Sequence, residues 1–379
     1  MKVGILAGQR SVTNYAGLDT GDLYRRVGNN TGNLAFVTAI ADQIASETYF
    51  FGWNASPEAL APIDIVVIPC ANQFGAHTDL GWLADVLLAA DKPVLAVGLG
   101  AQAASDEVSI MPTEGTLRWV RALEELCIGD APNILVRGEY TQKQLAAHGI
   151  MSTDVIGCPS MFLSARPKLG QDLARRQPSS DPVRVATLAG NSSWEGMAGV
   201  DQLMLEVAAG STQGLPWVIQ EQPELIDLTR GRDVHPDTLA RLTSHYAPRM
   251  PPAVFGAWVR ANGAAFFDIE GWQEHMLRFD AVVGPRFHGA MLAMQIGTPA
   301  VVVGHDSRTQ ELCETMSVPL VSASDVVEQG IEAAWATLRQ FDGAAFDQSR
   351  RRLAGRYVDS LRGHGIDIAH PLALLASEE

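Results

Sequence analysis

Short runs of β-branched and other apolar residues alternate with helix-like patterns along most of the chain. In the first part of the sequence these runs predict strands at Val3–Leu6, Tyr49–Phe51, Ile63–Ile68, Val94–Val97, Ile134–Val136 and Val155–Ile156. Between them, apolar residues recur at helical spacing in 33–46, 79–90, 116–127 and 140–149. Continuous apolar strands that alternate with helices are typical of a parallel sheet covered on both faces.

The same alternation returns after a polar stretch. Residues 166–182, RPKLGQDLARRQPSSDP, contain prolines and many charges, and we interpret them as a linker. Beyond it, strands are predicted at Val183–Leu188, Trp217–Ile219, Ala265–Phe267, Ala281–Val283, Ala300–Val303 and Pro319–Val321. Residues 222–260 are richer in helix, and amphipathic helices are predicted at 326–341 and 346–365.

This organisation predicts an α/β protein with two Rossmann-like lobes whose parallel sheets face a cleft. We expect an N-terminal lobe at 1–165, a linker at 166–182 and a C-terminal lobe at 183–340, followed at 341–379 by a helix that packs across the lobes. In such sheets ligands bind at the carboxyl ends of the strands, where helices begin. The cleft between the lobes is therefore the expected place of the chemistry.

One predicted strand end carries two polar residues in apolar surroundings. In VVGPRFHGAMLAMQIGTP, residues 282–299, Arg286 and His288 lie between a buried strand and an apolar helix. A helix N-terminus attracts anions, and Gly289 allows a ligand to approach the backbone closely. Alternatively, His288 caps its helix and Arg286 pairs with a carboxylate such as Asp280. Because unsatisfied polar groups are costly in apolar surroundings, we favour a binding site.

A further cation follows the next predicted strand. The turn GHDSR places His305, Asp306 and Arg308 at the carboxyl end of that strand. Arg286 and Arg308 can then flank one anion from neighbouring strand ends. Arg308 is equally compatible with a solvated position in the first turn of a helix.

Composition and charge limit the partners. The 379 residues include 28 Lys and Arg against 43 Asp and Glu, which gives a net charge of −15. Nucleic-acid binding depends on neutralising phosphates, so we expect no nucleic-acid partner. Cys70, Cys127, Cys158 and Cys313 form no C-x-x-C pair or zinc-site pattern, and we interpret them as buried hydrophobes in a reducing cytosol.

The chain offers no pattern of a targeting or membrane-spanning segment. The N-terminal MKVGILAGQR reaches glycine and polar residues too early for a signal peptide and fits a first strand. No apolar run approaches the ~18 residues of a transmembrane helix. We therefore expect a cytoplasmic protein.

The segment DAVVGPRFHGAMLAMQIGTPAVVVGHDSR, residues 280–308, resembles the signature of the polysaccharide pyruvyl transferase family. In that family an Arg-x-His-Gly-Ala opens an apolar helix, a Gly-Thr-Pro ends it, and a strand leads to an Asp-x-Lys-like turn. Three other parts resemble the family in the same order: GNNTGNLAF at 28–36, PVLAVGLGAQ at 93–102, and LVRGEYTQKQLAAHGI followed by VIGCPSMFL at 135–163. The resemblance spans about residues 3–321.

The resemblance implies a fold like that of the two-lobed GT-B glycosyltransferases, with the acceptor lobe first and the donor lobe second. Family members transfer the enolpyruvyl part of phosphoenolpyruvate to sugar hydroxyls in polysaccharides, oligosaccharides or glycosides, which gives a cyclic pyruvate ketal and phosphate. Phosphoenolpyruvate is thus the implied co-substrate, with no further cofactor and no metal. The acceptor remains open between a lipid-linked oligosaccharide, a nucleotide sugar and a simple glycoside. Only a lipid-linked acceptor implies a peripheral membrane contact.

By the same resemblance, His288 is the general acid, and Arg286 and Arg137 bind the phosphate or carboxylate of the donor, beside Gly289. A histidine suits this role because its pKa lies near working pH. Arg308 stands where the family usually has lysine; its guanidinium can hold phosphate but cannot donate a proton. Arg137 directly follows the apolar run NILV, and a structural ion pair is the alternative for it.

Other loop residues have two possible roles. Asn29, Asn30 and Asn33 can bind the acceptor or simply build a turn. Gln102 is a predicted acceptor contact, whereas the glycines of its segment can serve the turn alone. Two segments depart from the family pattern: Gly32-Asn33 stands where Gly-Asp is common, and TLAGNSSW at 187–194 lacks a frequent arginine.

Two other functions compete with a pyruvyl transferase. One is a GT-B glycosyltransferase with a nucleotide-sugar donor, and the other is a non-catalytic relative that binds sugars or phosphates. The Arg-x-His-Gly block and the cationic turn after it favour the pyruvyl transferase over a glycosyltransferase. The presence of His288 and both arginines counts against a non-catalytic relative.

Overall fold

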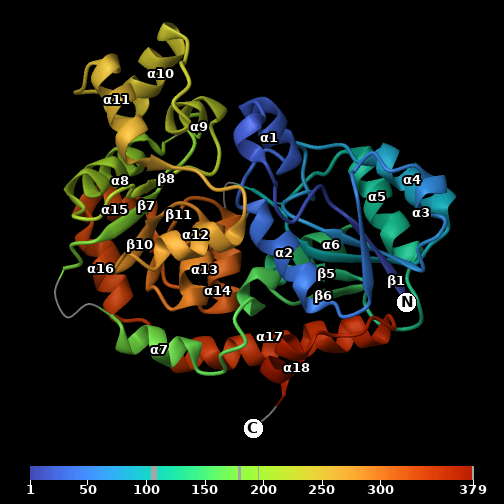
Figure 1. Ribbon diagram of the computed structural model, residues 1–379. Helices are drawn as coiled ribbons and strands as arrows, with labels where there is room; N and C mark the ends of the chain where they lie inside the picture. The colour runs from blue at the N-terminus through green and yellow to red at the C-terminus, as the bar shows by residue number, and fades with distance from the viewer. Residues whose placement is uncertain (104–108, 178–180, 195, 378–379) are drawn as a thin grey trace.

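The computed structural model describes residues 1–103, 109–177, 181–194 and 196–377. Within these ranges two six-stranded sheets form the centres of two lobes (Figure 1). The strands of the N-terminal sheet are β1 (Lys2–Leu6), β2 (Glu47–Phe51), β3 (Ile65–Pro69), β4 (Val94–Leu99), β5 (Ile134–Val136) and β6 (Thr153–Val155). Their order is β2-β1-β3-β4-β5-β6, and all neighbours are parallel.

The C-terminal sheet has the order β12-β11-β10-β7-β8-β9, again with parallel neighbours. Its strands are β7 (Val185–Leu188), β8 (Trp217–Val218), β9 (Gly263–Ala264), β10 (Ala281–Gly284), β11 (Ala300–Gly304) and β12 (Leu320–Ser322). The strands with continuous apolar sequence, such as β3 and β4, are buried at every position. The two parallel sheets confirm the predicted fold of two Rossmann-like lobes.

Helices cover the faces of both sheets. In the N-terminal half they are α1 (Thr20–Arg26), α2 (Asn33–Gln43), α3 (Pro57–Leu60), α4 (Gly81–Ala90), α5 (Glu114–Glu125) and α6 (Glu139–Ala147), with 3-10 turns η1 (Tyr15–Gly17) and η2 (Pro159–Phe162). In the C-terminal half they are α7 (Leu169–Arg175), α8 (Ala198–Gly210), α9 (Pro223–Thr229), α10 (Pro236–Tyr246), α11 (Pro252–Asn262), α12 (Ile269–Met276), α13 (Phe287–Ile296), α14 (Ser307–Met316), α15 (Ala323–Gln329), α16 (Glu332–Arg339), α17 (Gly343–Gly363) and α18 (His370–Ala376). Among the described residues, no helix is both long and apolar enough to cross a bilayer.

Some predicted elements differ from the structure. The strand expected at Ala265–Phe267 lies slightly earlier, as β9. The helix expected at 326–341 is divided into α15 and α16 at Gly330, whose φ of 73° favours glycine and interrupts a helix. The stretch interpreted as a linker contains α7. The boundaries of the lobes themselves stay a prediction.

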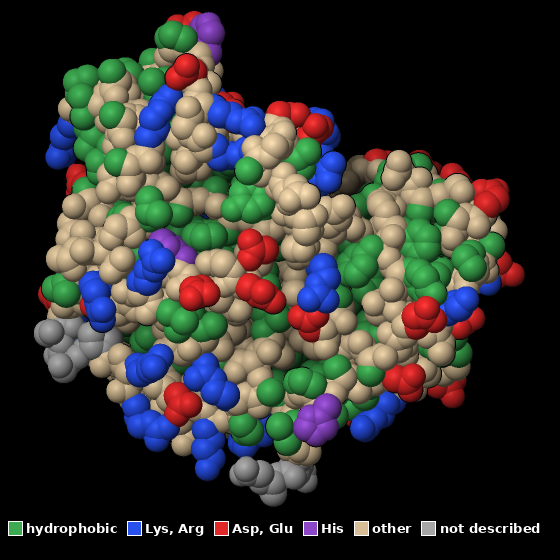
Figure 2. Space-filling model, viewed as in Figure 1, with side chains coloured by type: hydrophobic (Ala, Val, Ile, Leu, Met, Phe, Trp, Pro, Cys, Tyr) green, Lys and Arg blue, Asp and Glu red, His purple; other side chains and the backbone are tan. Residues whose placement is uncertain are grey.

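The long helix α17 runs along one side of both lobes in Figure 1. Its Arg350 is fully buried and donates hydrogen bonds to the carbonyl oxygens of Met161, Ser164 and Arg166. One apolar core continues from the N-terminal lobe through η2 and α17 to α13 of the C-terminal lobe. The lobes are therefore joined by packed structure on this side. Figure 2 shows that Lys and Arg side chains also gather on this side of the surface, near α7 and α17.

Candidate active site

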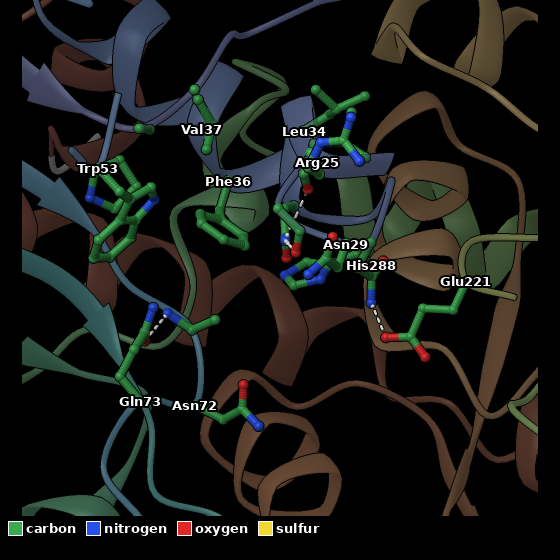
Figure 3. A pocket seen from close by; sticks show the side chains of 18 of the residues that line it. Arg25, Asn29, Leu34, Phe36, Val37, Trp53, Asn72, Gln73, Glu221 and His288 are labelled. Atoms are coloured by element: carbon green, nitrogen blue, oxygen red, sulfur yellow. Dashed lines mark hydrogen bonds between the residues drawn. The ribbon is translucent and has the colours of Figure 1, made fainter. Parts of the chain in front are cut away.

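A cavity of about 820 Å³ lies between the lobes and is lined by residues of both. On the N-terminal side the lining comes from the loops after β1 to β5, and from the end of α1, the start of α2 and the loop between these helices. On the C-terminal side Trp194, Glu221, His288 and Arg308 follow β7, β8, β10 and β11. In Figure 3, Trp53 and Glu221 lie at opposite sides of the cavity, with Phe36 and His288 between them. The cavity thus occupies the carboxyl ends of the strands, where the sequence predicts a ligand.

His288 lies in the first turn of α13 and faces the cavity. Its ring packs near Phe36, with 5.3 Å between ring centroids, and Nε2 lies 3.5 Å from the sulfur of Cys158. Burial, together with the charges of Arg137 and Arg308, holds the pKa of His288 well below its usual value. These causes favour a neutral imidazole until a negative charge offsets the two arginines.

Arg137 follows β5 and is almost completely buried while lining the cavity. Its Nε donates to the carbonyl oxygen of Gly98 at 2.8 Å, and Nη2 donates to that of Cys70 at 3.3 Å. A Cβ on Gly100 would lie only 2.8 Å from Cδ of Arg137, so glycine leaves room for this arginine. Burial is the main reason that the pKa of Arg137 is lowered. The backbone bonds fix its direction, and no carboxylate of the described residues forms the ion pair that was considered as the alternative.

Arg286 precedes α13 and is held from three sides. Its Nε donates to the carbonyl oxygen of Ala189 at 2.9 Å, Nη1 lies 2.8 Å from Oε2 of Glu221, and its guanidinium carbon lies 4.1 Å from the ring centroid of Trp194. It lies behind Trp194 and Glu221 and is not among the described residues that line the cavity. The partner Asp280, considered as an alternative, instead binds Arg184 at 3.0 Å.

Arg308 lies in the first turn of α14, the position for which the alternative prediction expected a solvated side chain. Its side chain is only 23% exposed and lines the cavity, with Nη2 at 3.4 Å from Oδ2 of Asp306. Asp306 caps α14 by accepting a bond from the backbone N–H of Thr309 at 2.8 Å. The ring of His305 stacks on Trp194, with 4.3 Å between centroids. The first turn of α14 thus holds Arg308 at the cavity rather than in solvent.

Several buried nitrogens at this end of the cavity have no hydrogen-bond partner among the described residues. They are Nη2 of Arg286, Nε of Arg308 and Nε2 of Gln220. All three atoms are donors only. Leaving a buried donor unpaired costs about 1–3 kcal/mol. Of these three residues Arg308 lines the cavity, and its unpaired Nε favours a ligand there that supplies acceptor oxygens.

All three predicted asparagines of the N-terminal loop line the cavity, and an acceptor contact stays a prediction for each of them. Asn33 donates to the carbonyl oxygens of Val27 and Gly28, at 3.0 Å each, and so builds the turn before α2. Asn29 lines the cavity with a φ of 61°, a left-handed conformation that asparagine tolerates. Asn30 also lines the cavity and donates to Oε1 of Glu221 at 2.8 Å.

Gln102 and Gly289 have structural partners as well. Gln102 lines the cavity and donates to Oδ2 of Asp306 at 3.1 Å across the lobes. A Cβ on Gly289 would lie 2.7 Å from Nε2 of Gln220 and 2.8 Å from Leu188. The close neighbours of Gly289 in this structure are therefore side chains, and its predicted contact with a donor stays a prediction.

Glu221 and Trp194 belong to the site but were not among the residues predicted for it. Glu221 follows the predicted strand at Trp217–Ile219, so its place at a strand end was the available signal. Trp194 lies in a loop whose sequence shows no periodicity. Both become recognisable only when Arg286 is seen between them.

The described residues contain no group of three or more His, Cys, Asp or Glu that could hold a metal ion. All four cysteines are free thiols; Cys70, Cys158 and Cys313 are buried, and Cys127 is half-buried. Burial raises the pKa of the Cys158 thiol although Arg137 opposes the shift. The thiol form of Cys158 therefore lies beside His288.

Comparison with known proteins gives two kinds of match. The sequence model of polysaccharide pyruvyl transferases matches residues 14–307, and a search of curated proteins finds no significant match. Among solved structures, the putative UDP-N-acetylglucosamine 2-epimerase from Listeria monocytogenes is 11% identical, with 93% of this chain and 94% of that chain covered and a TM-score of 0.47. The S. aureus MnaA–UDP co-structure is 10% identical, with 95% and 98% covered and a TM-score of 0.46. The glycosyltransferase SnogD from Streptomyces nogalater is 12% identical, with 99% and 97% covered and a TM-score of 0.32.

Proposed function

Because this chain belongs to the polysaccharide pyruvyl transferase family, we propose that it transfers the enolpyruvyl group of phosphoenolpyruvate to hydroxyls of a carbohydrate acceptor and releases phosphate. The observation that carries this proposal is the arrangement at one end of the cavity. There His288 lies within the electrostatic influence of Arg137 and Arg308, and the buried Nε–H of Arg308 has no hydrogen-bond partner among the described residues. This environment suits a small, multiply charged anion placed next to a proton donor.

The donor would be held by cations from both lobes. Arg137 reaches the cavity from the N-terminal lobe, and Arg308 reaches it from the C-terminal lobe. Guanidinium groups bind phosphate and carboxylate with two parallel hydrogen bonds, and the unpaired Nε of Arg308 is available for such a bond. The same cations stabilise the negative charge that develops on the departing phosphate.

In the proposed reaction, protonated His288 donates its proton to the methylene carbon of phosphoenolpyruvate. The carbon that bears the phosphate becomes electron-poor, and an acceptor hydroxyl adds to it and returns a proton to the neutral imidazole. A second hydroxyl then displaces the phosphate, which leaves with its bonding electron pair and takes up the second hydroxyl proton. The products are a cyclic ketal with a methyl group and inorganic phosphate, so atoms and charges balance.

The acceptor would occupy the N-terminal side of the cavity. Trp53 and Phe36 line this side and offer apolar ring surfaces, while Asn29 and Gln102 offer amide groups. Carbohydrates present both apolar C–H faces and hydroxyls, so rings and amides together suit a sugar. We propose a cytoplasmic location, with a membrane contact only where the acceptor is lipid-linked.

The proposed function predicts phosphate release that depends on both substrates. We expect purified protein, given phosphoenolpyruvate and a panel of acceptor glycosides, to release inorganic phosphate only when a suitable acceptor is present. Phosphorus NMR follows the loss of the phosphoenolpyruvate signal and the gain of the phosphate signal. Release of a nucleoside diphosphate from a nucleotide sugar, with phosphoenolpyruvate unchanged, would instead identify a glycosyltransferase.

Donor binding is expected to be coupled to protonation of His288. Without the donor, burial and the charges of Arg137 and Arg308 keep the pKa of His288 low and the ring neutral at pH 7. The bound anion offsets both arginines and raises that pKa, so the complex takes up protons. Affinity for phosphoenolpyruvate should therefore fall as pH rises through the pKa of His288 in the complex.

Calorimetric titrations at pH 7, in two buffers with different ionisation enthalpies, measure this proton uptake. The His288→Gln variant provides the baseline for protons exchanged by the phosphate of the donor itself. Wild type should take up more protons than this variant. Equal uptake by the two proteins would show that His288 does not change its protonation when the donor binds.

A further inference from the structure

The helix α14 of the C-terminal lobe lies against the start of α6 in the N-terminal lobe. Glu311, in the second turn of α14, accepts two hydrogen bonds from Thr141 of α6. Its Oε1 accepts the backbone N–H of Thr141 at 2.6 Å, and its Oε2 accepts the hydroxyl at 2.8 Å. Glu311 is 6% exposed and Thr141 is fully buried, so one carboxylate joins the two lobes where it is largely shielded from solvent.

Glu311 supplies the cap that α6 lacks in its own sequence. The N-cap of α6 is Gly138, which has no side chain to accept from the free N–H groups of the first turn. The N–H of Thr141 is the third of the helix, one of the two that an N-cap side chain usually binds. A carboxylate at a helix N-terminus is also favoured by the helix dipole. A Cβ at Gly138 would lie 2.3 Å from Cγ of Glu311, so glycine permits this close approach.

The contact between α14 and α6 is close in the chain to both arginines proposed for the donor. Arg308 lies three residues before Glu311, on the same side of α14. Arg137 directly precedes Gly138, and its own bonds to backbone carbonyls hold its guanidinium within the N-terminal lobe. The described ion-pair partner of Arg308, Asp306, belongs to the start of α14 itself. The position of Arg308 relative to Arg137 therefore depends on how α14 is docked.

The beginning of α14 is fastened to the N-terminal lobe as well. The N–H of Ser307 donates to the carbonyl oxygen of Ala103 at 3.3 Å, and the N–H of Ala103 donates to Oγ of Ser307 at 3.1 Å. These bonds hold the first residue of the helix, whereas Glu311 holds it one turn further along. A helix held at two successive turns cannot swing about its first residue. The direction of Arg308, which lies between the two contacts, is therefore defined.

We propose that Glu311 is a positioning residue: by docking α14 on α6, it holds Arg308 at the end of the cavity that Arg137 and His288 share, where the anionic donor binds. Glu311 is not among the described residues that line this cavity, so it acts through α14 and not on the reacting atoms. The inference rests on the proposed function for its ligand, phosphoenolpyruvate. The placement of Arg308, in contrast, can be tested without any ligand.

Two variants of similar size test whether the hydrogen bonds of Glu311 affect donor binding. Glu311→Met fills the space but cannot cap α6, and it should weaken binding of phosphoenolpyruvate about tenfold. Glu311→Gln should stay within about twofold of wild type, because its amide oxygen can accept the N–H of Thr141 and its NH₂ group can donate to the hydroxyl. Glu314→Met is the matched control, since Glu314 is exposed on the same helix and pairs with Gln310. It should bind like wild type in the same calorimetric titration.

An NMR titration of the His288 imidazole gives a readout without ligand. The charge of Arg308 contributes to the lowered pKa of His288. Displacement of Arg308 in Glu311→Met should therefore raise this pKa towards its usual value, whereas Glu311→Gln and Glu314→Met should not. In an Arg308→Met background, Glu311→Met should change neither the pKa nor donor affinity by more than about twofold, because the arginine that it positions is absent. A merely structural role would weaken binding equally in both backgrounds.

Thermal unfolding checks that every variant is folded. If Glu311→Met does not fold, Thr141→Ala replaces it; this change removes one of the two bonds and should weaken donor binding about threefold, with a raised pKa of His288. An unchanged pKa of His288, or an effect that is undiminished in the Arg308→Met background, would show that Glu311 does not position Arg308. Equal weakening by Glu311→Gln and Glu311→Met would mean that the charge of Glu311 matters, and not its hold on α14.

The failures of the two proposals are distinguishable. If wild type does not bind phosphoenolpyruvate but the pKa of His288 responds to Glu311→Met as expected, the proposed function fails and the placement of Arg308 by Glu311 stands without that ligand. If wild type binds phosphoenolpyruvate and neither the pKa nor the affinity responds, the positioning role is wrong and the proposed function stands.

Discussion

Replacing His288 by alanine is expected to reduce turnover by about 10²- to 10⁴-fold, the usual contribution of a general acid or base. Binding of phosphoenolpyruvate should change much less, by less than about tenfold, because Arg137 and Arg308 remain at the cavity. The imidazole is the group beside these arginines that can donate a proton near neutral pH, since guanidinium groups do not release theirs. Phosphate release measures turnover, and calorimetry measures donor binding.

His77→Ala is a suitable control for the histidine substitution. His77 lines the same cavity from the loop before α4 and is exposed, so its loss should affect turnover far less. The His288→Gln variant keeps a polar side chain of similar size and should be as inactive as His288→Ala. Full turnover in either His288 variant would remove this histidine from the mechanism.

The fold was accessible from sequence because its strands are almost uniformly apolar. In β3 and β4 every residue is buried, and such strands can be recognised without any knowledge of their neighbours. The strand β9 was misplaced because it comprises only Gly263 and Ala264, whereas the adjacent Ala265–Phe267 has the stronger β pattern. Short edge strands depend on their pairing, here with β8, more than on their own residues.

The proposed donor end of the candidate site was also partly predictable. Arg286 and His288 stand out because an apolar strand and an apolar helix flank them. Their position at a strand end follows from the alternation of elements alone. What the sequence did not indicate is that Arg286 lies behind Trp194 and Glu221, because these contacts join residues 65 to 92 positions apart in the chain, as their numbers show.

The proposed acceptor side was harder to predict for a physical reason. An asparagine loop can build its own turn or present its amides to a ligand, and both uses require the same residues. In the structure Asn33 does both, because its amide bonds within the turn while the residue lines the cavity, and Asn30 bonds to Glu221 across 191 positions of sequence. A carboxylate such as Glu221 resembles an ordinary surface residue until its three partners are located.

Replacing Arg137 by methionine is expected to weaken binding of phosphoenolpyruvate by at least about 30-fold, as for other charge partners removed from a largely buried site. Methionine approximates the length of the arginine stem and removes the charge, so the space beside Gly100 stays filled. Arg26→Met, at an exposed arginine of the same cavity, should weaken binding less than about threefold, because solvent screens that charge. Calorimetry measures both variants, and thermal unfolding confirms that they are folded.

The Arg137→Met variant also tests the electrostatic state of His288. Burial and the charges of Arg137 and Arg308 lower the pKa of that histidine, so removal of Arg137 should raise it towards its usual value. An NMR titration of the imidazole in the absence of donor measures this shift, and Arg26→Met should not produce it. A raised pKa together with weak donor binding would mean that one arginine has both effects: it binds the donor, and it keeps His288 neutral until the donor arrives. Unchanged donor binding would exclude Arg137 as a ligand, and an unchanged pKa would show that burial and Arg308 keep His288 neutral without Arg137.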